Sequence, residues 1–77
     1  MRKIKLIWDF RSPDALKIAE HHAKHLKEYV SIKNLDADTG FEALSDTHAI
    51  AFMVVEEPDA LALRDVLKPN RGLIYKA

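Results

Sequence analysis

The chain has 77 residues, no cysteine, and equal numbers of basic and acidic side chains, 12 of each. A formal charge of zero argues against a nucleic-acid-binding protein and against attraction to an anionic membrane. The lack of cysteine excludes a disulfide framework, a thiolate zinc site and a thiol nucleophile. So short a chain forms one domain, residues 1–77, and buries only about 60% of its unfolded surface. We therefore expect marginal stability unless the protein associates with itself.

The N-terminal segment alternates between two faces. Residues 3–10, KIKLIWDF, place four apolar side chains on one side and a mixed set on the other, which predicts a β-strand. Asp9 and Arg11 interrupt the apolar run that a signal peptide requires, and no later stretch reaches the length of a membrane span. We expect a soluble, cytoplasmic protein.

The clearest helical period covers residues 12–29. Ser12 can cap the first turn, Pro13 suits the first helical position, and Asp14 complements the positive end of the helix dipole. The helix is predicted to end between residues 28 and 33, where the helix propensity of the residues falls. One side carries an apolar stripe formed by Leu16, Ala19, Ala23, Leu26 and Val30.

Two further strands follow. Residues 39–45 form a short, partly polar segment that Gly40 weakens, which suits an edge strand. After a turn at Ser45 and Asp46, residues 47–56 are apolar on both faces, which predicts a central strand.

The C-terminal part predicts one helix and one strand. Pro58 begins the helix, which runs to Leu67. Its buried side is expected to hold Ala60, Leu63, Val66 and Leu67. Residues 68–72 are predicted to form a turn, and residues 73–76 a short final strand.

The predicted order is βαββαβ. The tetrapeptide Pro-Asp-Ala-Leu occurs at residues 13–16 and 58–61, each time after a predicted strand. The repeat suggests that the chain consists of two related βαβ halves. We predict an α+β ferredoxin-like fold with a four-stranded antiparallel sheet and both helices on one face. The first and third strands are central in that topology.

Two helices cover only one face of such a sheet, yet the central strands are apolar on both sides. Large exposed apolar patches usually mark an interface. The expected interface residues are Ile7, Ile50, Phe52 and Val54. In its element order and apolar strand faces, the chain resembles small ferredoxin-like proteins of the dimeric α/β-barrel type. This resemblance implies a homodimer closed through the open sheet faces.

Four residues could form a catalytic site. His22 lies in the apolar arc of the first helix, where Asp9 could be its partner, and His48 could join them as part of a general base. Arg11 lies at the end of the same strand as Asp9. A buried structural histidine is the simpler interpretation of His22.

Three other sets of residues are candidate sites. His21, His25 and Glu28 have helical spacing that permits a divalent metal, although a solvated helix face explains them as well. Lys68 and Arg71 could reach an anion, but there is no glycine-rich phosphate loop. The aromatic side chains Trp8, Phe10 and Tyr75 could line a pocket, although strand aromatics are more often core residues.

The sequence favours a homodimeric, non-catalytic module that binds a small ligand or has a regulatory role, with no cofactor. One alternative is a small cofactor-free or metal-assisted enzyme that uses Asp9, His22 and His48. Another is a protein-protein interaction module that uses the sheet face for a different chain. Whether the protein is an enzyme stays open, with a non-enzyme favoured.

Overall fold

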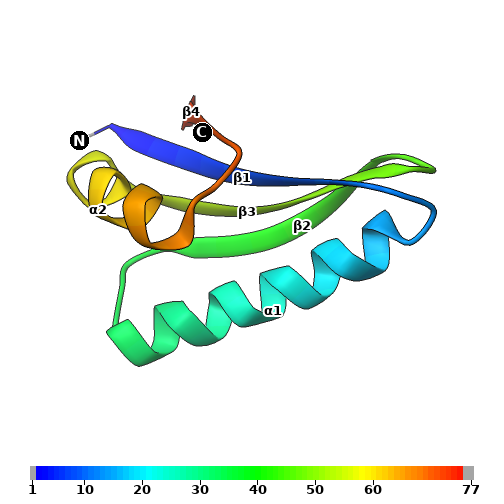
Figure 1. Ribbon diagram of the computed structural model, residues 1–77. Coiled ribbons are helices and arrows are strands. Elements are labelled where there is room, and N and C mark those ends of the chain that lie inside the picture. The colour runs from blue at the N-terminus through cyan, green and yellow to red at the C-terminus, as the bar shows by residue number, and fades with distance from the viewer. Residues whose placement is uncertain (1, 76–77) are drawn as a thin grey trace.

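The computed structural model describes residues 2–75 and contains six elements (Figure 1). They are β1 (Lys3–Arg11), α1 (Ala15–Lys33), β2 (Asp38–Ser45), β3 (His48–Glu56), α2 (Glu57–Leu67) and β4 (Arg71–Tyr75). The strands form one sheet in the order β2-β3-β1-β4, and all neighbours are antiparallel. The predicted ferredoxin-like βαββαβ fold is confirmed, with β1 and β3 in the centre.

Both helices pack on the same face of the sheet. α1 runs against β2 and β3, whereas α2 lies against β1 and β3 and leaves β4 largely uncovered. The main core forms between these helices and the sheet, where Trp8 also donates its indole N–H to the carbonyl of Leu67 at 3.1 Å. The buried core residues are Leu6, Trp8, Ala23, Leu26, Ala51, Met53, Val55, Ala60 and Leu63.

The strand register separates two sets of side chains. Leu6 pairs with Met53 and Trp8 with Ala51, so these residues face the helices. The intervening residues, including Ile7 and its partner Phe52, lie on the open face. This alternation decides which candidate residues can meet.

The first helix begins two residues later than predicted. Ser12 donates its backbone N–H to the carbonyl of Thr47 at 2.9 Å, which ties the connection between β1 and α1 to the turn before β3. Its hydroxyl accepts the N–H of Asp14 at 3.2 Å, and Asp14 takes the N-cap position. Ser12 and Pro13 therefore form a turn before the helix. α1 ends at Lys33, and its C-cap residue Asn34 adopts the left-handed conformation with φ 54°.

The last strand begins earlier than predicted. Arg71 and Gly72, expected in a turn, belong to β4 because they pair with Ile7 and Leu6 of β1. The predicted end at Lys76 lies outside the described residues. The preceding helix ends at Leu67, as predicted, and its C-cap residue Lys68 has a left-handed φ of 49°.

Some predicted core positions are exposed. Val66 of α2 and Leu16 of α1 lie at the flanks of their helices, away from the centre of the buried stripe. Tyr75 is also exposed, because it lies on the open face of an edge strand. No helix within residues 2–75 has both the length and the apolar character needed to cross a membrane.

Candidate functional site

Three charged or titratable side chains meet on the open face of the sheet. Asp9 lies on β1, between His48 of β3 and Arg71 of β4. His48 Nε2 is 2.8 Å from Asp9 Oδ1. The Arg71 guanidinium donates to both carboxylate oxygens, from Nη2 to Oδ1 at 3.0 Å and from Nε to Oδ2 at 3.1 Å. One carboxylate therefore joins three strands.

The loop before β4 supports this cluster. Asn70 accepts the backbone N–H of Asp9 on its side-chain oxygen at 2.7 Å and donates its own N–H to the carbonyl of Ile7 at 2.9 Å. These contacts fix the position at which Arg71 enters the sheet. The sequence predicted Asp9 and His48 as members of one site, but it assigned Arg71 to an anion-binding pair with Lys68 and gave no reason to place it beside Asp9.

The electrostatics of the cluster favour an ionised carboxylate. The hydrogen bonds from Arg71 lower the pKa of Asp9 below its ordinary value of 3.8; burial opposes this shift, and His48 adds to it. Both carboxylate oxygens already accept hydrogen bonds. The main pockets found on residues 2–75 include none of these three side chains. The arrangement therefore acts as an ionic clamp between strands.

The structure does not bring His22 to Asp9, because Asp9 projects from the open face of the sheet, whereas His22 belongs to α1 and packs against the opposite face. The imidazole of His22 packs against Trp8 and Phe10, with ring centroids 5.2 and 5.5 Å apart. Its Nε2 is buried and has no hydrogen-bond partner among the described residues. Burial, and then the nearby His25 and His21, lower its pKa from 6.5. His22 is a core-boundary residue.

The other candidate catalytic residue, Arg11, is exposed at the end of β1. It pairs in register with His48 but makes no ion pair within residues 2–75. The proposed set of four catalytic residues is therefore divided between the open face of the sheet, helix α1 and the end of β1.

The histidine pair on α1 is exposed. The Nε2 atoms of His21 and His25 are 3.0 Å apart, and their rings meet edge to face. No group of three or more histidine, aspartate or glutamate side chains in the described part of the chain is arranged to hold a metal ion. Glu28 does not complete a site with the two rings.

The two residues of the predicted anion-binding pair have different contacts. Arg71 directs its guanidinium at Asp9, so an acidic side chain already balances its charge. Lys68 is the C-cap residue of α2, where its backbone N–H donates to the carbonyl of Arg64 at 2.9 Å.

The four predicted interface residues lie together on the open face, but three are already buried within the single chain. Ile7 is only 2% exposed, and Ile50 and Val54 are similarly covered. The ring of Phe52 lies over Gly40, and the Lys5 ammonium is 4.4 Å from the ring centroid. The open face is thus less apolar toward water than the sequence suggests.

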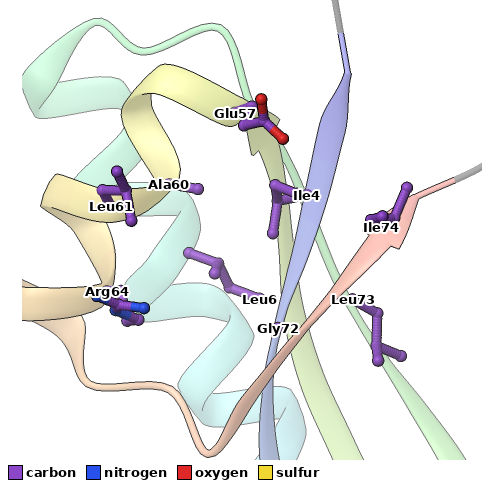
Figure 2. A pocket seen from close by; sticks show the side chains of 9 residues that line it. All are labelled: Ile4, Leu6, Glu57, Ala60, Leu61, Arg64, Gly72, Leu73 and Ile74. Atoms are coloured by element: carbon purple, nitrogen blue, oxygen red, sulfur yellow. The ribbon is translucent and has the colours of Figure 1, made fainter.

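The main apolar hollow lies elsewhere, between α2 and β4 (Figure 2). Its volume is about 470 Å³. Ile4 and Leu6 of β1 form part of its wall, and Glu57 and Arg64 of α2 are the charged residues that line it. The remaining lining residues are Ala60, Leu61, Gly72, Leu73 and Ile74. We call this feature the α2–β4 groove.

Sequence reasoning missed the α2–β4 groove. Its signal was present in Leu61, an apolar residue that fits no buried stripe, and in the apolar residues of the final strand. Leu61, Leu73 and Ile74 are all exposed in the structure. The groove exists because α2 packs over β1 and β3 and does not extend to β4.

Comparisons of the chain with protein-family models, with curated proteins and with solved structures find no match.

Proposed function

We propose that the protein is a small, non-catalytic binding module, active as a homodimer, whose binding surface is the α2–β4 groove. The observation that carries this proposal is the apolar hollow of about 470 Å³ beside exposed Leu61 and Ile74. Its volume lies within the range of about 300–1,000 Å³ that is typical of ligand sites. A cytoplasmic location is part of the proposal and rests on the sequence alone.

The distribution of exposed apolar side chains supports this choice of surface. Two large exposed apolar side chains, Leu61 of α2 and Ile74 of β4, lie on the helix side of the sheet and line the groove. On the open sheet face, Ile7, Ile50 and Val54 are already covered within the chain. A partner therefore removes more apolar area from water at α2 and β4 than at the centre of the open face.

The alternative, a small enzyme, has one supporting observation. Asp9 contacts His48 at 2.8 Å, and a carboxylate that holds an imidazole is the arrangement of a general-base pair. Arg71 also neutralises Asp9, and the main pockets on residues 2–75 lie away from the pair. These contacts support a structural role for the cluster.

The binding proposal is tested with the fluorescent apolar dye anilinonaphthalene sulfonate at low protein concentration. Leu61 and Val66 are a matched pair, because both belong to α2 and are 62% and 63% exposed, but only Leu61 lines the groove. We expect Leu61→Ser to weaken dye binding about fivefold, since it removes part of the apolar contact. Val66→Ser should bind the dye as the parent does. Equal effects of the two substitutions, or no binding by the parent, would contradict the proposal.

A further inference from the structure

The two edge strands of the sheet differ in how they are protected. β2 carries the carboxylates Asp38 and Glu42 and a register irregularity between Ala43 and Ser45. Charges and bulges of this kind prevent edge-to-edge pairing. β4 has no bulge, Asp9 already balances the charge of its single ionised side chain, Arg71, and all five of its residues are exposed. Among residues 2–75, no strand pairs with its outer edge.

We infer that a second copy of the chain pairs through β4, antiparallel and with a two-fold axis at Leu73, and inserts Ile74 into the α2–β4 groove. The inference rests on the proposed function, because it names the occupant of the proposed binding surface. The pairing makes one eight-stranded sheet and places the helices of both copies on the same face.

The register follows from the positions of Gly72 and Ile74 on either side of Leu73 in β4. An axis at Leu73, the middle residue of the strand, sets Gly72 opposite Ile74 of the second copy. Both positions face the helices, since Gly72 pairs with Leu6 and Ile74 with Ile4. Gly72 leaves an open place in the groove wall, and Ile74 of the second copy has the apolar side chain that fills it. Symmetry repeats this contact at both ends.

The same register matches residues on the open face. It places Leu73 opposite Leu73 of the second copy and Arg71 opposite Tyr75. A guanidinium can stack on a tyrosine ring with its flat face while its N–H groups keep their bonds to Asp9. All pairs in this register are therefore complementary: small with large, apolar with apolar, and cationic with aromatic.

The charges beside the groove are also self-complementary. Glu57 lies toward Ile4 at one end of the α2–β4 groove, and Arg64 lies toward Leu6 and Gly72 at the other (Figure 2). A two-fold axis through Leu73 reverses these ends in the second copy. Arg64 of each copy then lies at the same end of the joint groove as Glu57 of the other, which favours this orientation.

The test is the mass of the full chain by sedimentation equilibrium over a wide range of concentration. We expect the parent to change from monomer to dimer as its concentration rises. Gly72→Val should raise the dissociation constant at least tenfold, because the new side chain fills the place that Ile74 of the second copy would take. A Cβ at Gly72 meets its nearest atoms, in Leu6 and Ile4, at 3.6 and 3.7 Å, so the single chain accommodates it. The variant should therefore keep or raise its melting temperature at low concentration.

Two further variants complete the test. Val66→Ser, on the flank of α2 outside the groove, should dimerise as the parent does. A double variant, Gly72→Ile with Ile74→Gly, exchanges the large and small positions and should restore association. A parent that stays monomeric, or Gly72→Val that dimerises like the parent, overturns the inference. A folded double variant that stays monomeric contradicts the register. Dye binding that depends on Leu61 in a monomeric chain would still support the groove as the binding surface.

Discussion

At the scale of single residues, His22 shows how a titratable group is placed in an apolar setting. Its ring packs between α1 and the aromatic side chains of Trp8 and Phe10, and its Nε2 is buried. The neutral imidazole suits this environment, because protonation would place a charge in a poorly solvated position near His21 and His25. The direction of its pKa shift links folding to pH.

We predict that His22 makes the protein less stable in mild acid. The unfolded chain binds this proton near pH 6.5, whereas the folded chain binds it only at lower pH. The free energy of unfolding is therefore unaffected above pH 6.5 and falls as pH drops below that value toward the folded pKa. His22→Leu should lose less stability than the parent between neutral pH and about pH 5 in urea denaturation.

If His22→Leu loses as much stability in mild acid as the parent does, this account is wrong. Asp9 does not interfere with the measurement, because its pKa is lowered from 3.8. The stability that Asp9 contributes is lost only when pH falls below 3.8 toward its folded pKa, outside the range of the experiment.

At the scale of elements, the two glycines of the chain have opposite roles in their strands. Gly40 of β2 lies beneath the ring of Phe52, and a Cβ there would be 2.6 Å from the end of that ring. Gly72 of β4 has no such overlap. Gly40 therefore permits the aromatic ring to cover the edge strand, whereas Gly72 leaves an opening toward the α2–β4 groove.

We predict that Gly40→Ala lowers the free energy of unfolding by about 1–2 kcal/mol, because Phe52 must move from its place beside Lys5. Gly72→Ala is the control: it should leave stability unchanged or raise it by up to about 1 kcal/mol, through reduced freedom of the unfolded chain. Urea denaturation of both variants at low protein concentration measures the difference. Equal losses would refute the assigned role of Gly40.

At the scale of the whole molecule, a small core and a free strand edge occur together. The helices cover the centre of the sheet but not β4, so part of the apolar surface is left for another contact. A chain of this length gains limited stability from its own core. Association through β4 would add to that stability by mass action.

We therefore predict a melting temperature that depends on concentration. For the parent it should rise by about 3–5 °C for each tenfold increase in protein concentration above the dissociation constant. For Gly72→Val the rise should begin only at a protein concentration at least tenfold higher than for the parent. Differential scanning calorimetry measures both, and a parent with a constant melting temperature would oppose a folded dimer.

The sequence by itself determined the order of the elements and the two faces of the central strands. These properties depend on local period and on the chemistry of helix starts and turns, which act over a few residues. It also indicated that His22 belongs to an apolar face, because helical spacing fixes that relation. The exact start of α1 could not be predicted from the sequence, because the hydrogen bond from Ser12 to Thr47 joins distant parts of the chain.

Only the tertiary structure decided which candidate residues meet. Asp9 and His22 are separated because strand pleat directs Asp9 to the open face and Trp8 to the helices. Arg71 joins Asp9 because the β4 register places it beside Ile7, a pairing between residues more than sixty positions apart. The α2–β4 groove likewise depends on how far α2 extends across the sheet. Local patterns do not encode such long-range distances, and packing sets them.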